Sequence, residues 1–485
     1  MAEGTGKKIV KGVAYNSAAR FLVIAIQGVA GIVLARLLSS TDYGIVAFAA
    51  IFVTFLSQFS DFGIGSALVE RKVVDQKVLN TAFTVRNLLS LVLIVVAVVL
   101  SFIVPHFFDT PHIDWVIRLL ALNFVLNSFG FVSSALLRRE MNFLGGNIAL
   151  LVSTAAGAVV AVVLALYGFG FWSLVYSALV SSLVSAIVIN IIRPCHLRYE
   201  FHRETVREFW KFGSYMFLAG LTTYVLFNTA NFIVGAVAGA EMLGYFSLAL
   251  DWGSRVPVLL GMTVLSVLFP AFASIRDDKA QLRKMYVESV RYSGFLAILL
   301  NGTLLCISED FLRTILGAGT DKWMPALDCF RILCVYGIVR AILEPLGNVI
   351  VVFGDTKVLF QANLIASVVQ IALLYPALAW FGVEGVAFVV LCSYALQYAI
   401  YLPYMASRAE IGAGIFLKAV SLPVFCSVSF VAVYGMFHYW GVGDSLPLIG
   451  LKVVVYAAAY VLPFSYLTDF QIVRHLKELT SARMQ

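Results

Sequence analysis

Several arginines lie inside long apolar stretches of the sequence, where a charged side chain is costly and usually faces an interior cavity. The guanidinium group is planar, permanently charged and multidentate, so it is the natural partner of phosphate. A cavity with such walls suits an anionic ligand, and a pyrophosphate group fits that description. The candidates for binding it are Arg20, Arg86, Arg255, Arg291 and Arg340.

Depth within the apolar stretches separates these arginines. Arg20 lies about two helical turns inside its stretch and Arg255 about three turns inside. Arg340 is deeper than a side chain reaching for the surface readily allows. Arg86 and Arg291 lie within about two turns of an end, where extension of the side chain to the interface is an equal alternative. We therefore expect Arg20 and Arg255 to bind the anion, with the other three in secondary roles.

Acidic residues near two of the arginines offer a competing role. Asp251 precedes Arg255 by four residues, and Glu344 follows Arg340 by four. This spacing puts both members of a pair on one helical face, so a structural ion pair is the alternative in each case. Arg20 has no acidic residue three or four positions away, which leaves its charge more available for a ligand.

Three carboxylates are candidates for holding a coupling ion, either Na⁺ or H⁺, because ionisable groups at membrane depth usually mark ion pathways. Asp61 lies near the end of its apolar stretch, where a role as a helix cap or loop residue is equally good. The three candidates are Asp61, Asp251 and Glu344.

Polar residues form a stripe on each of two apolar stretches. At 100° per residue, Arg20 and two neutral residues share one face of the first stretch, and three residues at 213–236 fall within about 60° of one another. Such stripes either line a cavity or hydrogen-bond to neighbouring helices, and we favour the cavity. The predicted lining residues are Asn16, Gln27, Tyr224, Asn228 and Asn231.

Motifs of other chemistries are absent from the sequence. The six cysteines include no CxxC pair and mostly lie in apolar stretches, which is typical of small buried hydrophobic residues. The six histidines form no HExxH motif, and no GxxxxGK followed by Ser or Thr is present to hold nucleotide phosphates. We therefore expect no metal, no cofactor and no catalytic residues.

The elements that carry these residues must be membrane helices. The 485 residues are 61% hydrophobic and 13% charged, with a mean hydropathy of +0.93. A soluble domain has about 25% charged residues, whereas a bilayer accepts this excess of apolar surface. Apolar runs of about 20 residues exclude the alternating strands of a membrane barrel. The sequence predicts an all-α polytopic membrane protein with about fourteen transmembrane helices.

The basic residues between the predicted helices fall on one side of the membrane. With the N-terminus in the cytoplasm, the outer loops contain only two basic residues, Arg313 and Lys322. Because positively charged loops stay in the cytoplasm, topology accounts for the net charge of +7, and we expect no nucleic-acid partner. The prediction is a multi-pass protein of the inner (cytoplasmic) membrane with both termini in the cytoplasm.

A short motif occurs twice, about 200 residues apart. LLSSTDYG at 37–44 corresponds to GAEMLG at 239–244, and each turn closes on a glycine, Gly44 or Gly244, where the next helix starts. The repeat predicts two parallel six-helix halves around a central site. We expect an N-lobe over 1–192, a basic cytoplasmic linker over 193–212, a C-lobe over 213–404, and two further helices with a cytoplasmic tail over 405–485.

Several segments resemble, in order and spacing, the polysaccharide-transporter branch of the multidrug/oligosaccharidyl-lipid/polysaccharide exporter superfamily. The resemblance covers about residues 7 to 400, while the last helices look generic. The segments that carry it are LARLLSSTDYGIVAFA, FSDFGIGSALVERKVVDQKVLNTAF, ALLRREMNF, GAVAGAEMLGYFSLA and VLFPAFASIRDD.

This resemblance implies two V-shaped lobes of six helices, often with two extra helices, that work by alternating access. It implies the export of an undecaprenyl-pyrophosphate-linked oligosaccharide, and a central cavity with arginines on the first lobe and on helix 8. Arg20 and Arg255 match those positions by helix. Many relatives carry an Asp in helix 7 where this sequence has Ala230 in NTANFIVG, which puts ion coupling through that carboxylate in doubt.

The resulting hypothesis is a flippase for lipid-linked oligosaccharides in surface polysaccharide biosynthesis, acting as a monomer and a secondary-type transporter rather than an enzyme. Its expected partners are the lipid-linked oligosaccharide, membrane lipids and the glycan polymerase machinery. One alternative is an ion-coupled multidrug exporter of the same superfamily, which would favour acidic cavity residues. A membrane glycan polymerase or ligase is disfavoured because the outer loops are short, and a scaffold without transport is disfavoured by the buried arginines.

Overall fold

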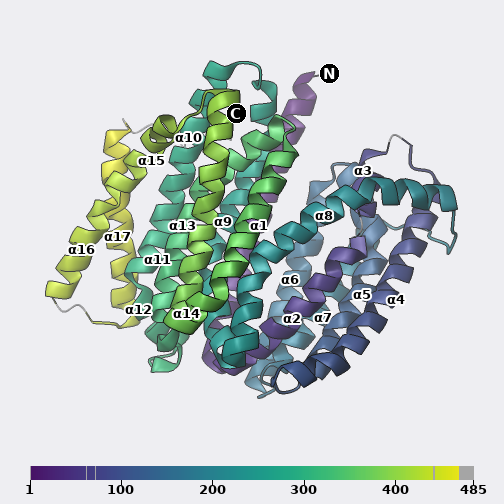
Figure 1. The fold of residues 1–485 in the computed structure, drawn as a ribbon, viewed down its shortest axis with the longest axis horizontal. Coiled ribbons are helices and arrows are strands. Elements are labelled where there is room, and N and C mark those ends of the chain that lie inside the picture. Colours follow the sequence, from purple (N-terminus) through teal and green to yellow (C-terminus); the bar gives the residue numbers. More distant parts are fainter. Residues whose placement is uncertain (1, 62, 72, 441–442, 469–485) are drawn as a thin grey trace. The chain divides into compact units, whose positions relative to one another are not determined.

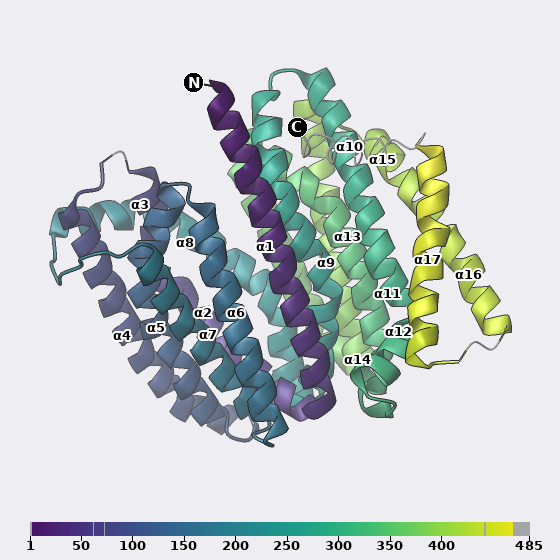
Figure 2. The same ribbon diagram turned by 180° about the vertical axis from the view of Figure 1, so that it is seen from behind.

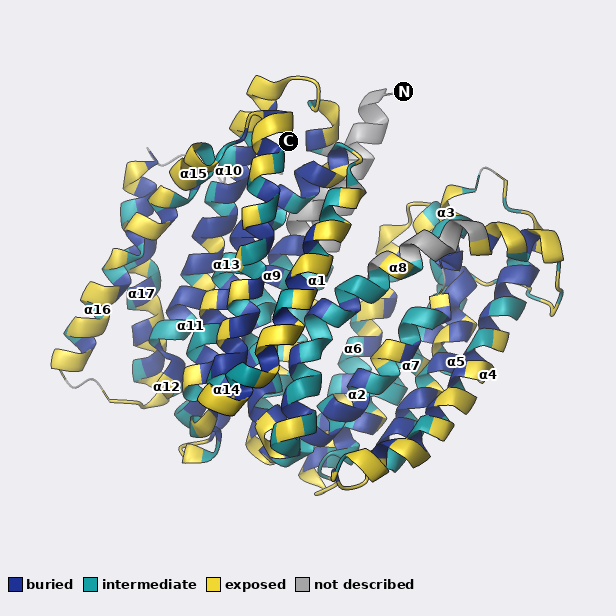
Figure 3. Ribbon diagram, in the orientation of Figure 1, coloured by how far each residue is buried: buried dark blue, intermediate teal, exposed yellow. Residues whose placement is uncertain are grey.

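The computed structural model describes residues 2–61, 63–71, 73–440 and 443–468. Within these ranges the chain forms helices joined by short turns, and no strand. Eleven stretches among the described residues are long and apolar enough to cross a membrane. Figure 3 shows exposed residues along the helices, and many of them are large and apolar, among them Leu91, Val95 and Phe102. This outward display of apolar groups suits contact with lipid, and the predicted all-helical membrane fold is confirmed at this level.

The chain divides into two compact units. Unit 1 comprises 1–248 and 363–386, and unit 2 comprises 249–362 and 387–485. The lobe boundaries expected from the sequence repeat stay a prediction.

Unit 1 contains the first eight α-helices and the start of the ninth (Figure 1). Their bounds are α1 Ala2–Leu37, α2 Ser40–Asp61, α3 Ile64–Glu70, α4 Gln76–Phe107, α5 Ile113–Arg139, α6 Phe143–Leu166, α7 Trp172–Ile192, α8 Arg203–Ile233, the π-helical turn η1 Val234–Ala238, and the first part of α9 Gly239–Ser274.

Unit 2 contains the rest of α9 and the later helices. Their bounds are α10 Lys279–Ala297, η2 Ile298–Gly302, α11 Thr303–Cys306, α12 Ser308–Asp310, η3 Phe311–Leu316, η4 Asp321–Ala326, α13 Leu327–Val352, α14 Thr356–Ala409, α15 Ala413–Cys426, α16 Val428–Tyr439 and α17 Leu446–Leu467. Within α14, residues 363–386 belong to unit 1, and the helix breaks at Gly382, where φ is 66°.

Side-chain caps fix where several helices begin. Asp75 accepts a hydrogen bond from the amide of Val78 at the start of α4, at 2.9 Å. At the start of α2, Ser39 and Asp42 form a reciprocal cap, because the Asp42 carboxylate accepts from the Ser39 amide while the Ser39 hydroxyl accepts from the Asp42 amide. Such caps satisfy amides that have no partner within the helix.

Small residues let the helices of unit 1 approach closely. Gly157 of α6 faces Ser181 of α7, and the hydroxyl of Ser177 donates to the carbonyl of Gly157 at 2.8 Å. Helix association in lipid depends on such close packing and interhelical hydrogen bonds. Figure 2 shows α1 running along α6, with which it packs.

The repeated glycines meet each other within unit 1. A methyl group on Gly44 of α2 would overlap the backbone carbonyl of Ala240 in α9, and one on Gly244 of α9 would overlap that of Ser40 in α2. The two helices therefore cross backbone to backbone through matching small-xxx-small pairs, Ser40 with Gly44 and Ala240 with Gly244. Both glycines lie inside helices at this contact, rather than closing the turns as the motif suggested.

In unit 2, the last two helices are held by aromatic packing and one buried ion pair. Tyr460 of α17 stacks on Phe295 of α10 and on Phe430 of α16, with ring centroids 5.4 and 5.2 Å apart. The ammonium of Lys452 in α17 lies 2.7 Å from a carboxylate oxygen of Asp310 in α12, and both side chains are about nine-tenths buried. The structural role of Lys452 is therefore this pair between α17 and α12.

The crossing of α2 and α9 predicts that glycine-to-alanine substitutions change the stability of the protein in opposite directions, depending on their position. Gly44→Ala and Gly244→Ala each force backbone separation, so each should destabilise the protein by about 1–3 kcal/mol or more. Gly146→Ala in α6 meets nothing within 4 Å and should leave stability unchanged or raise it slightly, since alanine restricts the unfolded chain. Denaturation midpoints of the purified proteins in detergent measure these effects, and equal midpoints for the three variants would contradict the crossing.

Candidate anion-binding site

Arg86 of α4 is a buried cation without a hydrogen-bonded partner among the described residues. The residue is 8% exposed, and neither Nε nor Nη1 makes a hydrogen bond. The guanidinium carbon lies 4.9 Å from the centre of the Phe131 ring, a contact worth up to about 2 kcal/mol when desolvated. Asp61 acts on Arg86 only through its charge, without an ion-pair contact. An unpaired buried charge normally costs several kcal/mol.

This arginine lines a cavity of about 210 Å³ between α4, α5 and α7. The polar members of its lining are Asn127 and Ser134 of α5 and Ser185 of α7. Gly130 lies opposite Ala186, where an added Cβ would lie 3.1 Å from the Ala186 Cα. The cavity therefore offers one cation together with amide and hydroxyl donors, which is a suitable set for an anionic oxygen group.

Hydrogen bonds next to the cavity hold α4 and α5 together. The Ser128 hydroxyl donates to Oδ1 of Asn87 at 2.7 Å, and the Ser90 hydroxyl donates to the carbonyl of Phe124 at 3.0 Å. These neighbours of Arg86 are satisfied, whereas the arginine itself is not. Arg86 therefore differs from these three neighbours, because its buried guanidinium nitrogens have no hydrogen-bond partner.

The other predicted anion-binding arginines are engaged to different degrees. Arg255 of α9 forms an ion pair with Asp251 at 2.6 Å and lies over the Trp252 ring at 4.1 Å. Arg340 of α13 lies 3.7 Å from Glu344. Both pairs are the intrahelical alternatives that the four-residue spacing allowed.

Arg20 of α1 and Arg291 of α10 are half-buried. Nε of Arg291 is buried without a hydrogen bond. The roles proposed for these arginines in binding an anion stay predictions.

Two of the predicted cavity-lining residues make hydrogen bonds within or between helices, and the role of the other three stays a prediction. The Tyr224 hydroxyl donates to the carbonyl of Ile51 at 2.6 Å, joining α8 to α2, and Asn228 donates to the carbonyl of Tyr224. Oδ1 of Asn231 is buried without a partner. Gln27 is exposed, and the side chain of Asn16 lies outside the described residues.

The acidic candidates for ion coupling also have structural roles. Asp61 accepts a hydrogen bond from the amide of Gly65 at 3.0 Å and so caps the start of α3, the alternative considered from the sequence. Asp251 and Glu344 are paired with arginines as described above. Among the described residues, no group of three or more His, Cys, Asp or Glu side chains could hold a metal ion.

Sequence reasoning missed the polar residues that line the cavity with Arg86. Asn127 and Ser134 lie seven residues apart on the same face of α5 as Phe131, a spacing that could have indicated a polar stripe facing α4. Ser185 carried no such signal, because only folding brings α7 beside α4 and α5.

The helices and their apolar surfaces define the class of protein, which is a multi-pass membrane protein. Residues 33–328 match the family described as "Polysaccharide biosynthesis protein", and the chain belongs to this family. The predicted resemblance is thereby confirmed.

Two relatives and one solved structure place the chain more closely. It is 25% identical over 365 residues to the lipopolysaccharide biosynthesis protein WzxC of Escherichia coli (strain K12), a match that covers 74% of this chain and 72% of WzxC. It is 23% identical over 485 residues to the succinoglycan biosynthesis transport protein ExoT of Rhizobium meliloti (strain 1021), covering 98% and 96%. The fold is similar to that of the lipid II flippase MurJ in an inward closed conformation, with a TM-score of 0.77, 16% identity, and 94% and 99% of the two chains covered.

The cavity leads to a binding prediction with a matched control. Inorganic pyrophosphate should raise the melting temperature of the wild-type protein, because a ligand that binds only the folded state stabilises it. Arg86→Met should lose this shift yet melt no lower than the wild type, since an apolar replacement removes an unpaired buried charge. Arg118→Met is the control: Arg118 donates to Ser101 at 2.8 Å and lies 3.6 Å from Asp114, so this variant should melt lower and keep the shift. Retention of the shift in Arg86→Met would contradict the site.

Proposed function

We propose that this protein is a flippase that moves a polyprenyl-pyrophosphate-linked oligosaccharide from the cytoplasmic to the outer leaflet, for surface polysaccharide biosynthesis. The observation that carries the proposal is the buried, unpaired Arg86 in a polar cavity of a chain that belongs to the polysaccharide biosynthesis protein family. The name of ExoT, a biosynthesis transport protein that matches nearly the whole chain, and the likeness of the fold to MurJ support it.

The physical task of such a flippase is to carry polar groups through hydrocarbon. Transferring an ionised phosphate group from water to an apolar medium costs far more free energy than transferring a neutral polar group, unless the charge is paired. Basic side chains in hydrated cavities remove most of that cost, while the prenyl tail stays in lipid. We propose that Arg86 pairs with the phosphate in unit 1, and that Arg20, Arg255, Arg291 and Arg340 contribute at other stages of transport.

We further propose fourteen membrane crossings in two six-helix lobes with two extra helices, and alternating access between the two membrane faces. Dividing two of the eleven apolar stretches at Gly239 and Gly382, where φ is positive, and adding α13 gives that number. The inner membrane, with both termini in the cytoplasm, is the expected location because basic residues gather on one side.

The charges favour an anionic cargo over the organic cations of a multidrug exporter. Asp251 and Glu344 are each paired with an arginine, and Asp61 caps a helix. The cavity of unit 1 contains Arg86 and no carboxylate among its lining residues. Coupling to Na⁺ or H⁺ through one of these carboxylates, function as a monomer, and contact with a glycan polymerase stay proposals.

Export by variants in the native host tests the function. Deletion of the gene should remove the surface glycan and trap lipid-linked intermediates on the cytoplasmic side. Arg86→Met, and the pair Arg20→Ala with Arg255→Ala, should fail to restore the glycan at normal protein levels, because the phosphate loses its cationic partners. Arg118→Met, once corrected for its protein level, should restore it. Full export of the glycan by Arg86→Met and by the Arg20→Ala, Arg255→Ala double variant would contradict the flippase function.

A further inference from the structure

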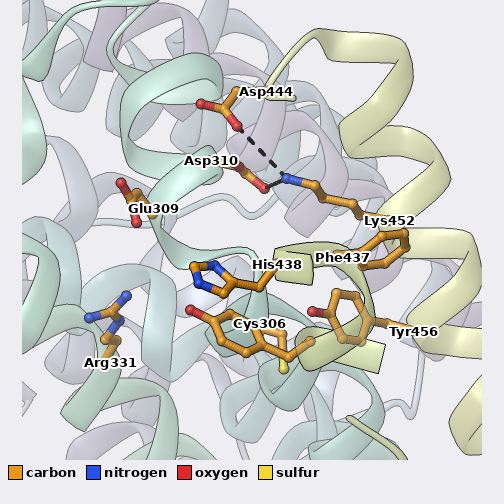
Figure 4. Close-up of a pocket in the computed structure, with 10 residues that line it drawn as sticks. Cys306, Glu309, Asp310, Arg331, Phe437, His438, Asp444, Lys452 and Tyr456 are labelled. Atoms are coloured by element: carbon orange, nitrogen blue, oxygen red, sulfur yellow. Dashed lines mark hydrogen bonds and ion pairs between the residues drawn. The ribbon is translucent and has the colours of Figure 1, made fainter. Parts of the chain in front are cut away.

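A second cavity, of about 200 Å³, lies in unit 2, at the end of the unit that carries α12 and the start of α17 (Figure 4). Its lining combines charged groups of both signs with aromatic rings. Figure 4 shows Glu309, Arg331, His438 and Asp444 around one space, with the Lys452–Asp310 pair at its edge. The lining residues that matter below are Glu309, Arg331, Tyr434, Phe437, His438 and Asp444.

The lysine of this cavity is already neutralised. The Lys452 ammonium lies 2.7 Å from Asp310 and 3.8 Å from Asp444. With both the Lys452 and Asp310 side chains about nine-tenths buried, breaking this pair would leave an uncompensated buried charge, which is strongly destabilising. The pair is therefore part of the frame that holds α17 against α12, and its cation is not available to an anionic ligand.

The groups at the open side keep unused hydrogen-bonding capacity. Glu309 makes one long contact, 3.3 Å, with Arg313, and its side chain is 50% exposed. Arg331 donates from Nε to the Ser308 hydroxyl at 3.1 Å and contacts Asp328 at 3.3 Å, which leaves donors of its five unoccupied. The cavity thus presents carboxylate acceptors and guanidinium donors side by side.

The balance of charge argues against phosphate here. The lining holds the carboxylates of Glu309, Asp310 and Asp444 against the cations of Arg331 and Lys452, so its carboxylates outnumber its Lys and Arg side chains by three to two. An anion would meet the two carboxylates nearest the opening, and like charges at such distances repel. A cation would meet Arg331. A neutral, many-hydroxyl ligand meets neither penalty.

Aromatic faces complete the cavity. The rings of Tyr434 and His438 on α16 are nearly parallel, with centroids 6.4 Å apart and planes 3° from each other. Phe437 packs edge-on against Tyr456 at 5.7 Å. A sugar ring has an apolar face of C–H groups that packs on aromatic rings, while its hydroxyls each donate and accept.

The cavity also lies close to a membrane–water interface, where a sugar headgroup would be found. The exposed Tyr439 and Trp440 follow at the end of α16, and aromatic residues of this kind gather at membrane–water interfaces. The opposite end of unit 2 carries the Lys279–Glu410 pair, at 2.8 Å, between the start of α10 and the end of α14 (Figure 1). Positively charged segments mark the cytoplasmic side, so this cavity is on the outer side of the topology proposed above.

We propose that this cavity is a subsite for a neutral saccharide, which binds a sugar unit of the exported glycan at the outer face. The proposal rests on the flippase function. Glu309 and Asp444 accept hydrogen bonds from the sugar hydroxyls, Arg331 donates to them, and Tyr434 with His438 provides the ring face. The cavity is smaller than the sites of about 300–1,000 Å³ that hold drug-sized ligands, so it takes one sugar unit rather than a long chain.

Saturation-transfer NMR on the purified full-length protein tests the subsite. The probes are the methyl β-glycosides of glucose, galactose and N-acetylglucosamine, with inorganic phosphate and short-chain phosphatidylethanolamine as competitors. At least one glycoside should bind saturably, and Glu309→Gln or His438→Ala should weaken it about tenfold, as expected for loss of a charge-assisted hydrogen bond or ring contact. Both side chains are exposed, so these changes spare the core. Glu288→Gln, an exposed glutamate on α10 outside the cavity, is the control and should bind like the wild type.

Three results would overturn the subsite: no glycoside binds, the two variants bind like the wild type, or phosphate or phosphatidylethanolamine displaces the glycoside and so identifies a lipid headgroup site. Export assays separate this failure from failure of the flippase. If the protein exports glycan but binds no glycoside, only the proposed subsite is wrong. If the purified protein binds glycoside at this cavity but deletion of its gene leaves glycan export unchanged, the flippase function is wrong.

Discussion

The backbones of α2 and α9 touch where Gly44 faces Ala240 and Gly244 faces Ser40. Hydrophobic burial cannot drive helices together in lipid, so close packing of small residues must do so. Each pair comes from the same place in the repeated motif, and each supplies a carbonyl where the other lacks a side chain. A single Cβ on either helix would push the pair apart, and the Tyr224 hydrogen bond to Ile51 would have to adjust with it. The arrangement of unit 1 depends on this contact.

Within each unit, charged side chains of the helices are paired in two ways. Some are paired on their own helix, as Arg255 is with Asp251, and another is paired across helices, as Lys452 is with Asp310. Arg86 is neither, and its cost is offset only by a ring contact and by the distant charge of Asp61. A buried cation such as Arg86, which lines a cavity and has no hydrogen-bond partner among the described residues, can gain free energy by binding an anion.

The sequence was a good guide wherever the physics is local. Hydropathy indicated the helices, the four-residue spacing allowed the ion pairs of Arg255 and Arg340 as alternatives to anion binding, and the position of Asp61 allowed a cap as an alternative to ion coupling. It was a poor guide wherever distant segments meet. Gly44 was interpreted as a turn residue because only its neighbours were visible, whereas its partner lies 196 residues away at Ala240. Lys452 and Asp310, and Arg86 and Ser185, are brought together by packing that no local period encodes. Depth counted along a helix made Arg86 a candidate for reaching the interface, but the crossing of α4, α5 and α7 buries it.

The central claim is that basic side chains in this helical bundle carry a pyrophosphate-linked glycan across the bilayer. Reconstitution tests it most directly: the purified protein is placed in liposomes with a fluorescent polyprenyl-pyrophosphate oligosaccharide, and an added membrane-impermeant glycosidase measures how fast the inner pool becomes accessible. The account predicts that the wild-type protein accelerates this exposure and that Arg86→Met reduces it toward the rate of empty liposomes. Equal rates with and without the protein, or equal rates for the wild type and Arg86→Met, would contradict it.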